Sequence, residues 1–208
     1  LRRSGARVLI TAGPELAPDT WDAARVLAAG GGLDAVLVLR PTGAPGAPEP
    51  LAAVDGVGVG YLTELAADLD PSGFHGDPPG SADLAALFHT GGTTGVPKLA
   101  AHTHANEVTD AWMLAANSLF DADSVLFAAL PLFHVNALVV TLLEPLFKGQ
   151  EVVWAGPLGY REPALFREFW KIVEHYRVAS MSSVPTVYAG LAQRPVDAVP
   201  DPRPALVG

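Results

Sequence analysis

The sequence predicts an α/β fold with a mostly parallel sheet and helices on both of its faces. Short, continuous apolar runs rich in β-branched side chains alternate with longer segments of helical composition. Such uninterrupted runs are typical of strands buried on both faces, which occur in parallel sheets. Loops rich in Pro and Gly separate the segments and mark where each one ends. Half of the residues are hydrophobic, which is enough for a sizeable core.

Residues 1–40 predict a βαβ segment. The runs 6–11 (ARVLIT) and 35–39 (AVLVL) have the pattern of buried strands. Between them we expect a helix over residues 21–29, ended by the three glycines that follow it. A strand, a helix and a second strand in this order indicate a parallel pair joined by a crossover.

Residues 41–82 are rich in Pro and Gly and predict an exposed connector with one short helix near residues 61–69. From residue 83 to residue 208 the pattern predicts a second α/β segment. There we expect strands at 84–88, 98–103, 124–130, 151–155 and 179–184, and helices at 104–119, 135–143, 163–177 and 185–193. The helix at 135–143 is apolar on all sides, which predicts that it is fully buried and ended by Pro145 and Gly149.

The charge of the chain argues against one class of partner. Asp and Glu outnumber Lys and Arg by 22 to 13, which gives a formal net charge of −9, and the basic residues form no cluster along the sequence. Nucleic-acid binding depends on neutralising phosphates, so we expect no nucleic-acid partner. The longest apolar stretch, residues 137–147, is too short for a membrane span. The chain has no cysteine, which is compatible with a reducing compartment, and we expect a cytoplasmic protein.

The most informative stretch follows the predicted strand 84–88. It contains three threonines, three glycines and one lysine, namely Thr90, Gly91, Gly92, Thr93, Thr94, Gly95 and Lys98. Glycine allows backbone N–H groups to turn inward and form an anion-binding concavity, and the lysine supplies a compensating charge. The spacing fits neither G-x-x-x-x-G-K-[ST] nor G-x-G-x-x-G, and Gly/Thr-rich loops also occur as plain turns. From the residues alone, a phosphate loop and a plain turn both remain open.

Residues 89–104, HTGGTTGVPKLAAHTH, resemble the phosphate-loop signature of the adenylate-forming (AMP-binding) superfamily. The residues that fall on matching positions are Thr90, Gly92, Thr93, Thr94, Gly95, Pro97 and Lys98. The sequence departs from the signature at His89, Gly91 and Leu99, where the family has tyrosine, serine and glycine. Two further segments, PLFHVNAL at 131–138 and SVPTVYAGL at 183–191, are similar to later motifs of the same family in the same order.

The resemblance favours the acyl-CoA synthetase, or fatty-acid–CoA ligase, branch. It implies that the chain is an incomplete, internal part of the large N-terminal domain, without the C-terminal domain. The reaction it implies has two steps: a fatty or other apolar acid reacts with ATP to give an acyl adenylate, and coenzyme A then displaces AMP. The implied small molecules are therefore ATP, Mg²⁺, coenzyme A and a carboxylic acid. We expect the 208-residue fragment to be inactive alone and to self-associate through formerly interior surface.

The resemblance also assigns roles to residues. Thr90 to Gly95 and Lys98 would bind the nucleotide phosphates, with Lys98 balancing charge on the pyrophosphate leaving group. Thr90 matches a threonine associated with Mg²⁺, although the carboxylate partner is absent from the chain. His134 matches a catalytic histidine between the nucleotide site and the acyl pocket. Val184 and Pro185 match residues of that pocket.

Each assignment has a structural alternative. His134 could be a histidine at a helix N-terminus whose polar groups are satisfied by backbone, and Val184 and Pro185 could be ordinary packing at a strand end. His102 and His104 have the spacing of metal ligands, but a structural role is the better interpretation because no third ligand is nearby in the sequence. For the whole chain, the alternatives are a non-catalytic nucleotide- or pyrophosphate-binding module and a degenerate structural homologue.

Overall fold

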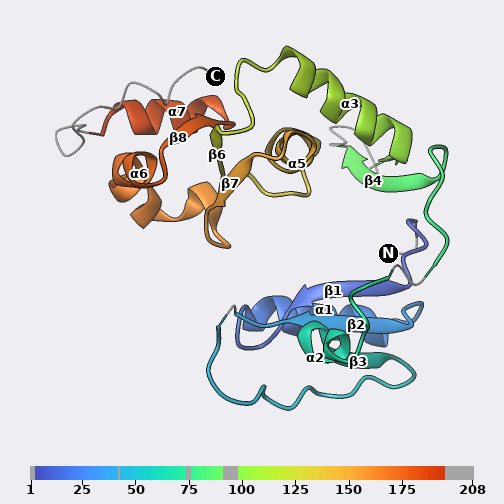
Figure 1. The fold of residues 1–208 in the computed structure, drawn as a ribbon. Coiled ribbons are helices and arrows are strands. Elements are labelled where there is room, and N and C mark those ends of the chain that lie inside the picture. The colour runs from blue at the N-terminus through green and yellow to red at the C-terminus, as the bar shows by residue number, and fades with distance from the viewer. Residues whose placement is uncertain (1–2, 42, 74–75, 91–97, 195–208) are drawn as a thin grey trace. The chain divides into compact units, whose positions relative to one another are not determined.

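A computed structural model describes residues 3–41, 43–73, 76–90 and 98–194. The chain divides into two compact units, Leu1–Pro78 and Pro79–Gly208, which are drawn in Figure 1. Each unit has its own parallel three-stranded sheet. The structure confirms the α/β class and adds one antiparallel strand pair to the parallel sheets.

In the first unit, strands β1 (Val8–Ala12), β2 (Ala35–Leu39) and β3 (Gly58–Tyr61) pair in parallel in the order β1-β2-β3. Helix α1 (Pro18–Ala29) joins the first two strands, and the short helix α2 (Leu62–Ala67) follows the third. The apolar runs of β1 and β2 therefore form the predicted parallel pair. The core consists of Trp21, Ala24, Ala28, Leu33, Val36, Val38 and Tyr61.

Strand β3 lies inside the stretch that the sequence predicts to be a connector. Its sequence is GVGY, so glycines occupy two of the positions where an apolar pattern would be visible. The strand forms because it extends an existing sheet, pairing from Ala35↔Gly58 to Val38↔Tyr61 along β2. Tertiary pairing thus overrides a composition that is unfavourable for a strand.

The second unit begins with an antiparallel hairpin of β4 (Leu84–Thr90) and β5 (Lys98–Thr103). Helix α3 (His104–Asn117) follows directly. Its first turn is fixed by a capping box in which the Thr103 side chain accepts the Asn106 N–H, and the Asn106 side chain accepts the Thr103 N–H. The strand that leaves the glycine loop therefore continues into the helix with no intervening linker.

The parallel sheet of this unit contains β6 (Val125–Ala128), β7 (Glu151–Trp154) and β8 (Val178–Met181) in the order β7-β6-β8. A 3₁₀ turn, η2 (Gly159–Arg161), and helix α6 (Pro163–Tyr176) connect β7 to β8, and helix α7 (Pro185–Ala192) follows β8. Helices α6 and α7 pack on β8 and on each other (Figure 1). Their core contains Phe127, Phe169, Trp170, Val173, Val178, Met181, Val187 and Leu191.

The predicted helix 135–143 differs from the structure in two ways. It is one continuous helical segment of α4 (Val135–Leu138), a π-helical turn η1 (Val139–Leu143) and α5 (Glu144–Lys148). Pro145 lies within the segment, because the wider π turn before it tolerates a residue that has no N–H. Gly149, with φ of +72°, ends the segment as predicted. The helix is only partly buried, since Val135 is exposed and Leu138 half-buried.

Candidate active site

The β4–β5 hairpin fixes the two ends of the predicted phosphate loop. Thr90 and Lys98 are directly paired across the hairpin, and the Thr90 hydroxyl donates to the Lys98 carbonyl at 3.3 Å. Both residues are exposed. The residues between them, including Gly91, Gly92, Thr93, Thr94 and Gly95, lie outside the described part of the chain. The described geometry therefore places one threonine and one lysine side by side at the exposed end of a hairpin.

The end of this hairpin contacts the second motif. The ring of His89 stacks on that of Phe133 with the centroids 6.2 Å apart, and Phe133 in turn contacts the His134 ring at 4.5 Å. The aromatic pair joins two segments that are far apart in the sequence. His89, which occupies the position of a tyrosine in the family signature, thus packs against Phe133 through its ring.

His134 precedes α4 and is exposed. Its backbone N–H donates to the Pro131 carbonyl and its carbonyl accepts the Leu138 N–H, both at 3.1 Å. Its side chain makes no capping hydrogen bond to the helix. The backbone groups are therefore satisfied, while the imidazole is not used as a helix cap.

Ser182, which directly precedes the third motif, contacts the second motif through polar groups. The Ser182 hydroxyl donates to Asn136 Oδ1 at 3.0 Å, and the Tyr160 hydroxyl donates to the Ser182 carbonyl at 3.3 Å. Burial raises the pKa of the Tyr160 phenol, so the phenol stays protonated and remains a donor. The Tyr188 hydroxyl donates to the Met181 carbonyl at 3.2 Å. These bonds attach the end of β8 to the segment around α4 and to the loop after β7.

A cavity of about 520 Å³ lies beyond the carboxyl ends of β6, β7 and β8. Ligands of open α/β sheets bind in this type of crevice, and the volume is within the usual range for small-molecule pockets. The lining is mostly apolar and comes from residues 128–133 at and after the end of β6, residues 154–161 at and after the end of β7, and Val184 and Val187 after β8. The predicted pocket residue Val184 is part of it. His134 and Pro185 are not, although each adjoins a lining residue, Phe133 and Val184.

Sequence reasoning missed the segment 154–161. It contributes half of the lining residues, yet it belongs to none of the three motifs. The available signal was its position: Gly156, Pro157 and Gly159 mark a turn directly after a predicted parallel strand. The carboxyl ends of parallel strands meet at one edge of a sheet, so a loop that follows β7 is expected beside the segments that follow β6 and β8.

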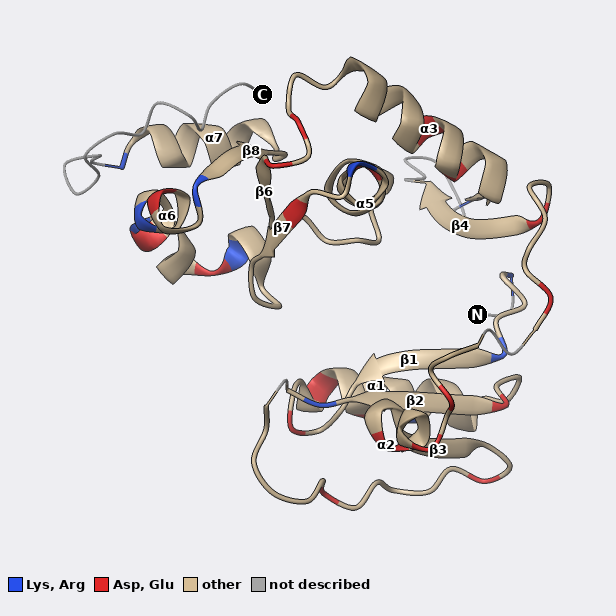
Figure 2. Cartoon of the chain, viewed as in Figure 1, with Lys and Arg blue, Asp and Glu red and all other residues tan. Residues whose placement is uncertain are grey.

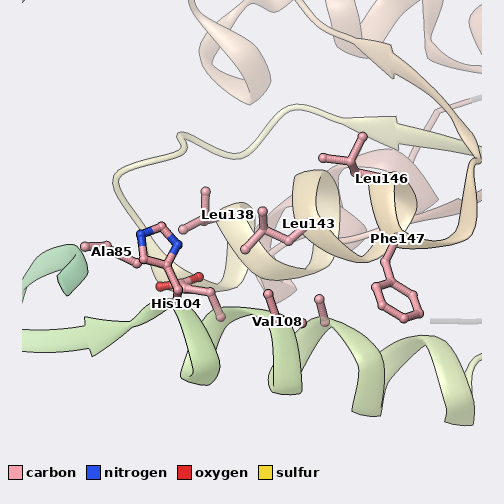
Figure 3. Close-up of a pocket in the computed structure, with 10 residues that line it drawn as sticks. Ala85, His104, Val108, Leu138, Leu143, Leu146 and Phe147 are labelled. Atoms are coloured by element: carbon pink, nitrogen blue, oxygen red, sulfur yellow. The ribbon is translucent and has the colours of Figure 1, made fainter. Parts of the chain in front are cut away.

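A second cavity, of about 390 Å³, is shown in Figure 3. It is lined by side chains of β4, α3 and the 135–148 helical segment, among them His104, Val108, Leu143 and Phe147. Of the predicted site residues that the structure describes, none lines it. Nearby, His102 Nδ1 lies 2.7 Å from Oε1 of the buried Glu107. His102 and His104 thus point to different surroundings, and within the described ranges no group of three His, Cys, Asp or Glu side chains could hold a metal ion.

The residues that the structure describes offer little for Mg²⁺ besides Thr90. Hard cations normally need several oxygen ligands, with carboxylates among them. The Thr90 hydroxyl is a single oxygen and already donates to Lys98. Thr90 by itself therefore does not fit a magnesium site.

The chain is acidic, and Figure 2 shows where its acidic and basic residues lie along the ribbon. The helices in the described ranges are all too short or too polar to cross a membrane.

Comparison with known proteins gives the family. Residues 1–205 match the family described as AMP-binding enzyme. The chain is 45% identical over 120 residues to a marinolic acid–CoA ligase of Pseudoalteromonas sp. (strain SANK 73390), a match that covers 55% of this chain and 18% of that protein. It is 38% identical over 120 residues to a sulfoacetate–CoA ligase of Cupriavidus necator, covering 57% and 22%. The aligned segments thus span about a fifth of each of these relatives.

Two solved structures are similar in fold. The apo structure of MatB from Rhodopseudomonas palustris aligns with a TM-score of 0.66 and 27% identity, covering 91% of this chain and 32% of that one. The anthranilate CoA ligase AuaEII, solved in complex with anthranoyl-AMP, aligns with a TM-score of 0.69 and 20% identity, covering 94% and 35%. Both alignments cover more than nine-tenths of this chain but only about a third of the larger protein. The chain therefore belongs to the AMP-binding enzyme family, of which it represents a partial domain.

Proposed function

We propose that this chain is part of an ATP-dependent carboxylate–CoA ligase, which forms an acyl adenylate and then an acyl-CoA thioester. The observation that supports this best is the convergence of three separate segments. The hairpin end at Thr90 and Lys98, the segment after β6 and the segment after β8 are linked by the His89–Phe133 stack and the Ser182–Asn136 hydrogen bond. The CoA ligases among the relatives support the same reaction class.

The nucleotide site proposed here is the loop that Thr90 and Lys98 close. The threonine hydroxyls and glycine N–H groups of residues 90–95 would bind the phosphates of ATP. Lys98, exposed beside Thr90, would stabilise the negative charge that develops on pyrophosphate as the α-phosphate is attacked. Such catalysis depends on positioning and electrostatics rather than on a covalent protein intermediate. A Mg²⁺ ion would need oxygen ligands beyond the Thr90 hydroxyl, such as nucleotide phosphates.

The acyl group is proposed to bind in the cavity beyond the ends of β6, β7 and β8. Phe133, Trp154, Leu158, Val184 and Val187 line it, which favours a fatty or other apolar acid. His134 would lie between this cavity and the nucleotide, because its ring contacts Phe133, and Phe133 both lines the cavity and stacks on His89. Pro185 would act through the turn that carries Val184. The relatives include both a marinolic acid and a sulfoacetate ligase, and their substrates therefore do not indicate one class of acid. The proposal of an apolar acid rests on the apolar lining of the cavity.

Two further proposals concern the 208 residues by themselves. Because the aligned relatives are several times longer, we propose that this chain alone does not complete adenylation.

We also propose that the chain self-associates through apolar side chains of α3 and α5 that are each more than half exposed. These side chains are Val108, Trp112, Met113, Leu146 and Phe147. Sedimentation would show a concentration-dependent dimer. A monomer at all concentrations would contradict the second proposal. No observation favours a non-catalytic binding module or a degenerate homologue.

The test is acid-dependent exchange of labelled pyrophosphate into ATP by the full-length protein. We expect Lys98→Ala to lower kcat by about 100-fold or more, the usual result of removing a group that stabilises transition-state charge. The matched control is Lys171→Ala, because Lys171 is exposed on α6 and pairs with the exposed Glu168 at 2.7 Å. Exchange that requires no acid, or equal rates for Lys98→Ala and Lys171→Ala, would contradict the proposal.

A further inference from the structure

The loop between β7 and α6 is fixed at both of its neighbouring strands. Next to β7, the Ala155 N–H donates to the Ala128 carbonyl at 2.8 Å, at the end of β6. Farther along, the Tyr160 hydroxyl donates to the Ser182 carbonyl at 3.3 Å, just after β8. The loop therefore crosses the carboxyl edge of the whole sheet and is bonded to it on both sides of the cavity.

Gly159 brings the same loop against the backbone that follows β6. It is buried, its φ is +51°, and a Cβ placed on it would lie 2.2 Å from the Ala129 carbonyl oxygen. Only a residue without a side chain allows this approach at this φ. The contact holds the turn of residues 156–161 onto the segment that begins the PLFH motif. The loop is thus a fixed wall rather than a free surface turn.

This wall presents two large apolar side chains to the cavity. Trp154 and Leu158 both line it, and they are 43% and 49% exposed. A leucine that is half exposed at the tip of a rigid turn is not needed for the core, since the core of this unit is built from other residues. Its exposed surface instead bounds the space that Phe133, Val184 and Val187 share.

We infer that the β7–α6 loop is the wall that limits the size of the acyl group, and that Leu158 is a specificity-determining residue. This inference rests on the proposed function and deepens it. An apolar acid that fills the cavity buries its chain against Leu158. The volume of this side chain therefore sets how many carbons fit, while the anchors at Ala128, Ala129 and Ser182 prevent the wall from yielding. One methylene in an apolar pocket is worth about 10- to 200-fold in discrimination.

The experiment compares two substitutions of opposite volume in the full-length protein. Acid-dependent pyrophosphate exchange is measured over a series of linear saturated acids, and the result is the ratio of kcat/KM for a longer acid to that for a shorter one. We expect Leu158→Ala to raise this ratio by about tenfold or more and Leu158→Trp to lower it by a similar factor. The ratio is independent of the fraction of protein that folds. The control is Leu146→Ala, which removes an exposed leucine of α5 outside this cavity and leaves the ratio unchanged.

The outcomes separate this inference from the proposed function. Ratios that stay within twofold of wild type in both Leu158 variants, or that move in the same direction, overturn the role of Leu158 while exchange itself supports the ligase. Failure of the wild type to exchange with any acid overturns the proposed function, and this inference with it.

Discussion

The two parallel sheets of this chain differ most at their carboxyl ends. In the first unit the strand ends are joined by side chains: Arg40, just after β2, pairs with Glu15 at 3.1 Å, and its guanidinium lies over the ring of Tyr61 at 5.7 Å. The Tyr61 hydroxyl donates to the Glu49 carbonyl at 2.9 Å. This edge is closed by one ion pair and one aromatic ring.

In the second unit the corresponding edge is open. The ends of β6, β7 and β8 surround a cavity of about 520 Å³, and the connections that follow each strand line it. Both units contain a three-stranded parallel sheet, although the strand orders differ, and the loops decide whether the edge can hold a ligand. Function depends on what the loops place at a site, not on the fold that supports them. The predictions below test this difference, from the largest expected effect to the smallest.

The largest effect is expected from the core that supports the open edge. Phe169 of α6 is 1% exposed and packs edge-to-face on Phe127 of β6 at 5.6 Å. Phe169→Ala leaves a cavity and should lower the free energy of unfolding of the second unit by about 3–5 kcal/mol. Chemical denaturation followed residue by residue measures it. Tyr176→Ala, on the same helix but 45% exposed, is the control, and an equal loss in both variants would contradict the assignment of the core.

The next effect is expected from the wall of the cavity. Gly159→Ala should lower the free energy of unfolding by about 1–3 kcal/mol. The φ of residue 159 is positive, which disfavours alanine, and the added Cβ would clash with the Ala129 carbonyl oxygen. Gly156→Ala in the same loop is the matched control, since a Cβ there meets nothing within 4 Å. Thermal melts of the two variants measure the difference. Equal melting temperatures would mean that the loop is not held against β6.

A smaller effect is expected at the closed edge of the first unit. Arg40→Met removes the pairing with Glu15 and leaves that half-buried carboxylate without its guanidinium partner. Arg25→Met removes only a more exposed pair with Asp22 at 3.4 Å, and such surface pairs contribute little. Denaturation of the first unit should therefore show a measurable loss for Arg40→Met and almost none for Arg25→Met. The reverse order would show that the strand ends are not joined through Arg40.

The smallest effect is the pH dependence of the same pair. The hydrogen bonds from Arg40 hold the pKa of Glu15 below its ordinary value of 4.5. A carboxylate with a lowered pKa stabilises the fold above its unfolded-state pKa, and this stabilisation is lost as the pH falls through the folded-state value. Wild type should therefore be more stable than Glu15→Gln at neutral pH, with the gap narrowing below pH 4.5. A gap that is constant from pH 7 to pH 3 would contradict this.

The sequence predicts the positions of β1, β2 and β6 well, because their continuous apolar runs need no tertiary information. The burial expected for β1 is wrong in part, since Val8 and Ile10 are 47% and 57% exposed. It also identifies the segments that meet at the candidate site, since Phe133, Asn136 and Val184 all belong to the recognised motifs. Strand β3 was not predictable, because GVGY becomes a strand only by pairing with β2. The π turn before Pro145 was missed for a similar reason, since a local rule ends a helix at proline.

The segment 154–161 was missed for the same reason, since its place at the cavity depends on tertiary contacts. Its role depends on three contacts that no local pattern encodes, to Ala128, Ala129 and Ser182. The PLFH and SVPT motifs form two sides of the cavity. The third side is the segment 154–161, which lies beside these motifs because the strand order is β7-β6-β8.

The central claim is that the acyl group binds at the open edge of the second unit and not at the closed edge of the first. The direct measurement is the change in backbone amide chemical shifts of the 208-residue chain on titration with octanoate. We predict saturable changes in the non-proline residues of 129–133, 154–161 and 182–187, and none at Gly13, Glu15, Arg40 or Tyr61. Changes concentrated at the closed edge, or none at the cavity at saturating acid, would contradict the account.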